Sequence, residues 1–211
     1  MNRTVLGCLG TIVVLGIILL VTLIGGYNHL TGLSQGVDSQ WAQVQNVYQR
    51  RLDLIPNLVQ TVQGAANFEK STLEEVTQAR AAAEGTGVDP NTAPTDPAKL
   101  AQFQAAQERL GAAVVHVLAV AENYPQLTAT QNFTDLQAQL EGTENRISVE
   151  RGRYNDTVQA YDTAVRSFPA VIYAGAMGFQ TKPYFAAATA AQTPPQVQFN
   201  FNNTPATAPG Q

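Results

Sequence analysis

Eleven polar residues interrupt stretches that are otherwise apolar at every third or fourth position, and they are the groups of this chain that could do chemistry. We call them the polar seam: Arg50, Arg51, Asp53, Asn57, Glu122, Asn123, Glu144, Asn145, Arg151, Tyr154 and Asn155. A charge on a packed helix face is costly unless it is paired. We therefore expect these side chains to meet across helices. A guanidinium matches a carboxylate in a two-bond fork, so Arg51 is expected to face Glu122 or Glu144, with Asn57 and Asn155 completing the network.

Three interpretations of the polar seam stay open. Buried polar groups can fix the register of packed helices, they can line a binding site for a ligand or partner, or Glu122 or Glu144 can serve a hydrolase. The sequence has no Glu-x-x-His or His-Glu-x-x-His pair and no glycine-rich phosphate loop. His29 and His116 stand apart, and the pair Glu74-Glu75 fits a solvated helix face. We expect no catalytic residue, no metal site and no cofactor.

Composition excludes some classes of partner. The formal net charge is −4 and no run is rich in Lys or Arg, so nucleic acid is not an expected partner. Cys8 is the only cysteine, which rules out an internal disulfide and a thiolate metal cluster within one chain.

The stretch from Val5 to Gly26 holds 22 residues without a charged side chain. As a helix with a rise of about 1.5 Å per residue it spans ~33 Å, enough to cross a hydrocarbon core of about 30 Å. It is longer than the apolar part of a signal peptide and no A-x-A cleavage pattern follows it. A lipidation box at Cys8 would come before the apolar stretch rather than after it. We predict an uncleaved anchor in the lipid bilayer, with Arg3 keeping the amino end inside and the remaining domain outside the cytoplasm.

Helical periodicity dominates the rest of the chain. From about Val37 to Ala66 the apolar face consists of Trp41, Val44, Tyr48, Leu52, Ile55, Val59 and Val62. Asp38 or Ser39 is expected to cap the start of this helix and Pro56 to kink it. A shorter helix fits residues 68–83; the pattern leaves open whether it is separate or continues the first as one bent rod.

Two further helices follow a loop at residues 84–95. Asp96-Pro97 is a start signal for a helix that Pro125 ends. The last long helix runs from about Asn132 to Phe168, and a short helix or turn follows before Phe185. We predict an all-α fold: a short flank (1–4), a single transmembrane helix (5–26), an antiparallel bundle of long helices (27–185) and a disordered low-complexity tail (186–211). Within the tail, Val197, Phe199 and Phe201 could form a short strand or a docking segment.

Several sequence blocks, in order, resemble the LemA family. They are YNHL (27–30), WAQVQNVYQRRLDLIPNLVQTVQGAANFEKSTLEEVTQAR (41–80), AENYPQLTATQNFTDLQAQLEGTENRISVERGRYNDTVQAYDTAVRSFP (121–169), MGFQTKPYF (177–185) and PPQVQF (194–199). The resemblance implies a bacterial single-pass membrane protein with a helical bundle and no established enzyme activity, cofactor or substrate. The residues that match its signature are Arg50, Arg51, Asp53, Pro56, Asn57, Glu122, Tyr124, Pro125, Phe133, Leu140, Glu144, Asn145, Arg151, Tyr154 and Asn155. Asp162 stands where relatives often carry asparagine, so we do not assign it the role of an amide.

Together these patterns favour a membrane-anchored interaction or scaffold protein of the bacterial envelope. Its partner would be a membrane or envelope protein that contacts the bundle or the tail. The alternative, from another class, is a membrane-bound sensor that binds a small ligand in the polar seam. Self-association through the helices is a third option.

Overall fold

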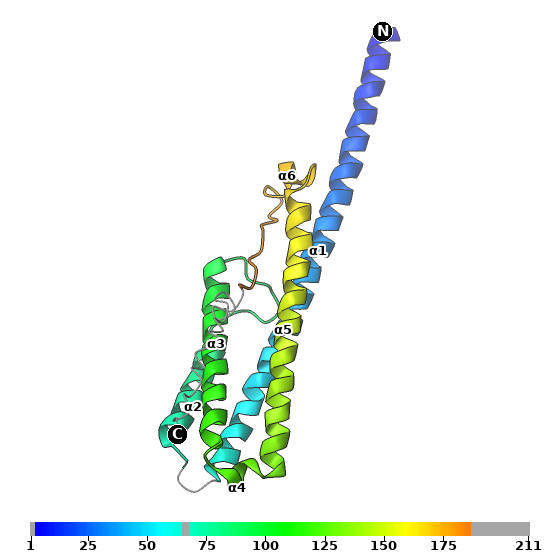
Figure 1. The fold of residues 1–211 in the computed structure, drawn as a ribbon. Helices are drawn as coiled ribbons and strands as arrows, with labels where there is room; N and C mark the ends of the chain where they lie inside the picture. The colour runs from blue at the N-terminus through cyan, green and yellow to red at the C-terminus, as the bar shows by residue number, and fades with distance from the viewer. Residues whose placement is uncertain (1–2, 65–67, 187–211) are drawn as a thin grey trace, which may run out of the picture.

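The computed structural model describes residues 3–64 and 68–186, with side chains from Leu9 onward, and every regular element in these ranges is a helix (Figure 1). This confirms the all-α class; the expected disorder of residues 187–211 and the strand at Val197 to Phe201 lie outside the described residues. The helices are α1 (Arg3–Gln63), α2 (Lys70–Glu84), α3 (Pro97–Ala121), α4 (Pro125–Thr128), α5 (Gln131–Arg166) and α6 (Ala170–Tyr173).

The apolar stretch and the first bundle helix form one continuous helix, α1. The expected helix start at Asp38 or Ser39 is therefore wrong: glycines such as Gly32 and Gly36 weaken a helix but do not stop it. Pro56 does not break α1 either, because the helix continues to Gln63.

The apolar side chains of α1 from Leu9 to Ile24 are mostly exposed. Within the described residues, α1 is the one helix long and apolar enough to cross a membrane.

The remaining helices pack beside the lower part of α1 in an up-and-down arrangement. α5 runs antiparallel along α1, and α2 packs mainly on α3 (Figure 1). α2 is thus an element separate from α1, which answers the question that the periodicity left open. Asp96 caps α3 as expected, since its Oδ1 accepts from the Ala98 amide at 2.8 Å and Pro97 follows it. The last long helix ends at Arg166, two residues earlier than predicted, so Phe168 lies beyond it.

The core consists of two hydrophobic clusters that follow one another along the bundle. The Leu58 cluster joins α2, α4 and the lower parts of α1, α3 and α5, and the Trp41 cluster joins the opposite part of the bundle to the segments 88–93 and 179–185. Between the clusters, each of the three long helices contributes one buried polar residue. We call this the polar layer: Arg51, Gln107 and Thr143.

Trp41 is the centre of its cluster. Its ring is completely buried and lies 5.4 Å from the ring of Phe103, 5.6 Å from Tyr154 and 6.0 Å from Phe185, measured between centroids. Its Nε1 donates to the Asp89 carbonyl at 2.8 Å, which satisfies the polar atom of an otherwise apolar side chain. Trp41 therefore joins α1, α3, α5 and both segments that cover them.

Replacing Trp41 with alanine should lower the free energy of unfolding by about 3–5 kcal/mol, because a large side chain is removed from a closed core. Denaturant unfolding followed by far-UV circular dichroism measures this loss. Val149→Ala is the matched control: Val149 is an exposed apolar residue on α5, and its truncation should change stability by less than about 0.5 kcal/mol. Equal losses for the two variants would contradict this description of the core.

Candidate functional site

Arg51 lies in the polar layer, with only 6% of its surface exposed. Its Nη1 donates to the Gln107 carbonyl at 3.2 Å and its Nη2 forms an ion pair with the Glu144 carboxylate. Of the two partners proposed from the sequence, the structure thus brings Glu144 to Arg51 and leaves Glu122 exposed at the end of α3. Burial lowers the pKa of the Arg51 guanidinium from its ordinary value.

A cavity of about 510 Å³ lies beside this ion pair, between α1, α3 and α5. Most of its lining is apolar, and its polar groups come from the polar layer and the residues next to it. The lining residues are Tyr48, Arg51, Gln107, Glu108, Gly111, Val114, Val115, Leu118, Leu140, Glu141, Glu144, Ile147 and Arg151. Burial raises the pKa of the Tyr48 hydroxyl further above neutral pH.

Two features of the lining suit a bound group. The side chain of Gln107 is buried, and its Oε1 has no hydrogen-bond partner among the described residues. Gly111 leaves room in front of Arg51, since a Cβ at this position would lie 3.8 Å from Nη1 and 3.9 Å from Nη2. An unsatisfied buried acceptor is costly, so a donor in the cavity would be stabilised if the Gln107 side chain turned its Oε1 toward it.

Three seam residues hold the carboxyl-terminal segment instead of contacting Arg51. Asn155 donates to and accepts from the backbone of Phe185, at 3.1 and 2.9 Å, and the hydroxyl of Tyr154 donates to the Pro183 carbonyl at 3.3 Å. Arg151 donates to the Ala186 carbonyl at 2.6 Å, with its guanidinium 4.9 Å from the centre of the Phe185 ring. Ala186, the first residue of the predicted tail, is thus hydrogen-bonded to α5.

The other seam residues lie on the surface, so the seam is not the single network expected from the sequence. Arg50, Asn57 and Asn145 are exposed, Asp53 accepts a bond from Gln49 one turn earlier, and Asn123 bonds back to the Val120 carbonyl. Spacing places all eleven seam residues near the helix interfaces, but only Arg51 and Tyr154 are buried in the core. Nor does His116 pack in the core: it forms an exposed pair with Glu75 at 2.9 Å.

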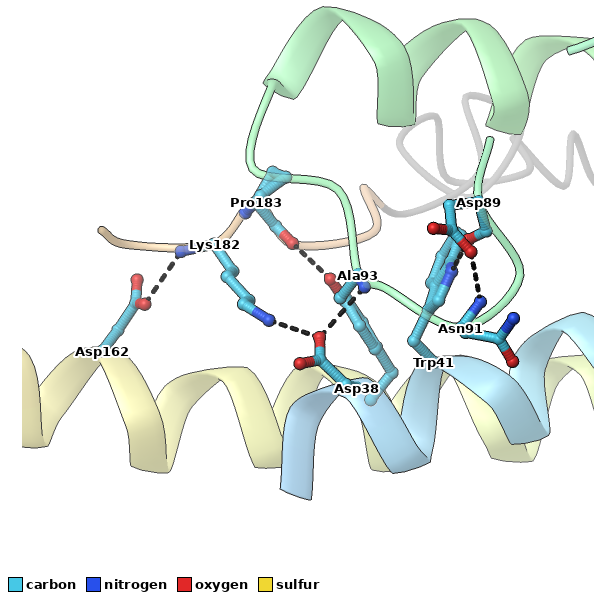
Figure 2. A network of polar contacts seen from close by, with 9 residues as sticks. Asp38, Trp41, Asp89, Asn91, Ala93, Asp162, Lys182 and Pro183 are labelled. Atoms are coloured by element: carbon cyan, nitrogen blue, oxygen red, sulfur yellow. Dashed lines mark hydrogen bonds and ion pairs between the residues drawn. The ribbon is translucent and has the colours of Figure 1, made fainter. Parts of the chain in front are cut away.

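A second polar cluster was missed by reasoning from the sequence. Lys182 is buried; its Nζ donates to Asp38 Oδ1 at 2.6 Å and its amide to Asp162 Oδ1 at 3.0 Å (Figure 2). The same Asp38 oxygen accepts from the Ala93 amide at 3.0 Å. Asp38 thus ties two loops to α1 rather than capping a helix. Lys182 is the only charged residue between Ser167 and Ala186, and that isolation was the signal available in the sequence.

Neither glutamate that was considered for a hydrolase lies free in the cavity. The carboxylate of Glu144 is engaged by Arg51, and Glu122 lies exposed outside the cavity. In the described ranges, no group of three or more His, Cys, Asp and Glu residues could hold a metal ion.

Comparison with known proteins gives one family and three relatives. A model of the LemA family matches residues 40–199. Magnetosome proteins MamQ 1 and MamQ 2 of Paramagnetospirillum magneticum are each 25% identical to the chain over 194 residues, covering 83% of this chain and 70% of the relative. Magnetosome protein MamQ of Magnetospirillum gryphiswaldense is 24% identical over 190 residues, with the same shares covered.

Replacing Glu144 and replacing Arg51 should lower the free energy of unfolding by different amounts. Glu144→Gln should lower the free energy of unfolding by about 1–3 kcal/mol, because Arg51 stays in the core without its counter-charge. Arg51→Met should cost less, since methionine fills much of the same space and the Glu144 side chain, already 63% exposed, returns to water.

Chemical denaturation of both variants measures this order. Glu141→Gln serves as the control, because Glu141 is exposed one turn from Glu144 and bonds only to the exposed Gln137 among described residues. A larger loss for Arg51→Met than for Glu144→Gln would contradict the assignment of the buried charge to Arg51.

Proposed function

This chain belongs to the LemA family, and from that premise we propose that it is a membrane-anchored interaction module of the bacterial envelope. Its binding site is the cavity between α3 and α5 beside Arg51, which receives an apolar side chain of a partner protein. The observation that carries the proposal is this cavity: it is largely apolar, it reaches the surface and it is built on three rigid helices.

The anchor in this proposal is the amino-terminal part of α1, as a single pass through the inner membrane. Its apolar side chains are exposed and the helix continues without interruption into the bundle. Arg3 precedes the apolar stretch, and the next positive residue, Arg50, lies far beyond it. By the positive-inside rule the bundle then lies outside the cytoplasm.

A protein partner fits the lining of the cavity. Val115 is 65% exposed although it lies at the cavity, and it is accompanied by Leu118, Leu140 and Ile147. Apolar surface surrounded by charged side chains is typical of sites where a partner inserts one anchoring side chain. The surrounding groups carry both signs, from Glu108 and Glu141 to Arg151, so charge alone selects no partner.

A second candidate is a sensor that binds a small molecule at the same place. The unpartnered Oε1 of the buried Gln107 favours it, because a small ligand with an N–H or O–H donor would satisfy this atom once the Gln107 side chain turned toward the cavity. Native mass spectrometry of the purified full chain separates the candidates: a retained small molecule, lost in a variant with a filled cavity, supports the sensor.

Filling the cavity should abolish partner binding without unfolding the bundle. In Gly111→Phe the ring enters the space in front of Arg51, whereas in Gly152→Phe, the control, the added side chain meets open space on α5. Photocrosslinking of the full chain in native membranes measures the result, with a photoreactive residue at position 115. We expect the crosslinked partner to be lost in Gly111→Phe and kept in Gly152→Phe, with unchanged thermal unfolding in both. A partner that survives in Gly111→Phe would overturn the assignment of the cavity.

The orientation has its own test. Ser148 is exposed on α5, so Ser148→Cys in a Cys8→Ala background gives a single reactive thiol outside the apolar stretch. We expect a membrane-impermeant maleimide to label intact spheroplasts at this position. Labelling only after lysis would place the bundle in the cytoplasm and reverse the orientation.

A further inference from the structure

One patch of exposed apolar side chains lies at the end of the bundle from which α1 emerges. Phe168 is 82% exposed, Ile172 72% and Val171 55%. We propose that these three residues, the α6 patch, enter the lipid interface and give the protein a second membrane contact beside α1.

The position of α6 along α1 supports this contact. Tyr173 packs so closely on Gly26 that a Cβ there would meet its hydroxyl oxygen at 1.9 Å, which places α6 where the charge-free stretch of α1 ends. One residue further, the ring of Tyr27 lies 5.5 Å from that of Phe179, which follows α6. In Figure 1, α6 is at the end of the bundle from which α1 extends toward the amino terminus.

The side chains of α1 change from exposed to buried at the same level. Among the described residues of α1, Leu30 is the first fully buried apolar residue, whereas the apolar side chains from Leu9 to Ile24 are mostly exposed. If α1 crosses the bilayer with these exposed residues, the interface with water lies between Ile24 and Leu30. The α6 patch then occupies the depth at which amphipathic segments lie in the plane of a membrane.

The composition of the segment fits a lipid surface. Residues 167–181 contain no charged side chain, although they are on the surface of an acidic protein. Grouped exposed apolar residues are unfavourable in water unless something covers them. Among the described residues, α3 and α5 each carry one large exposed apolar side chain, Val115 and Val149, and the segment after α6 carries the less exposed Met177 and Tyr184. Without basic residues in the segment, the contact depends on apolar insertion rather than on anionic lipid.

This inference rests on the proposed membrane anchor, so its test must separate the two. Single cysteines replace Ile17 in the span, Ile172 in the α6 patch or Val149 on α5, in the full chain carrying Cys8→Ala. Each protein is labelled with the environment-sensitive fluorophore NBD and reconstituted in vesicles of phosphatidylethanolamine and phosphatidylglycerol. Quenching by phospholipid with a nitroxide on the acyl chain then reports lipid contact, and thermal unfolding of each labelled protein confirms a folded bundle.

We expect blue-shifted, nitroxide-quenched emission at positions 17 and 172, and water-like emission with several-fold weaker quenching at 149. Quenching at 17 with water-like emission at 172 overturns the second contact and leaves the anchor intact. A blue shift at 172 without nitroxide quenching also overturns it, since a protein surface would then cover the patch. Absence of quenching at 17 removes the anchor and the inference together.

Discussion

A guanidinium buried between two hydrophobic clusters is the constraint on which the rest of this bundle depends. Arg51 brings a permanent charge from α1 into the core, where it needs the carbonyl of Gln107 on α3 and the carboxylate of Glu144 on α5. Sliding any of these helices by a turn would leave the charge without one of these partners. The clusters on either side hold no buried charge that must be matched across all three long helices, so we attribute the register chiefly to the polar layer.

The same constraint produces the cavity. A long charged side chain that crosses between helices cannot be packed as tightly as leucine or valine, and Gly111 opposite the guanidinium leaves further space. Fixing the register and providing a binding site are therefore compatible roles of one group. The more distant polar cluster of Asp38, Asp162 and Lys182 does not share this space; it closes the other part of the bundle by tying the segments 88–95 and 181–186 to α1 and α5.

Local patterns predicted the helices well, and they predicted only part of the site. The period of three and four identified the faces of Trp41, Val44 and Tyr48. Charge predicted that Arg51 pairs with Glu122 or Glu144, and the structure shows that the partner is Glu144. The prediction that Asp38 caps a helix was wrong, because a residue able to cap a helix can also bond to distant loops from a position inside a helix. Most other seam residues proved exposed, since helical position alone does not tell which side of an interface a polar side chain takes. The contact between Lys182 and Asp38 joins residues 144 positions apart in sequence. Such a contact produces no periodic pattern from which it could be predicted.

Because α1 is continuous, it also fixes the distance between the end of its charge-free stretch and the polar layer. Gly26 and Arg51 are 25 residues apart on one continuous helix, so at about 1.5 Å per residue the polar layer stands about 38 Å along the helix axis from the end of the charge-free stretch. On the proposal that α1 anchors the protein and the cavity binds a partner, a membrane protein with only short loops outside the bilayer would not reach the cavity at that distance. Such a partner would need a domain or a long helix of its own that extends to that level, so the length of α1 would restrict which partners can bind.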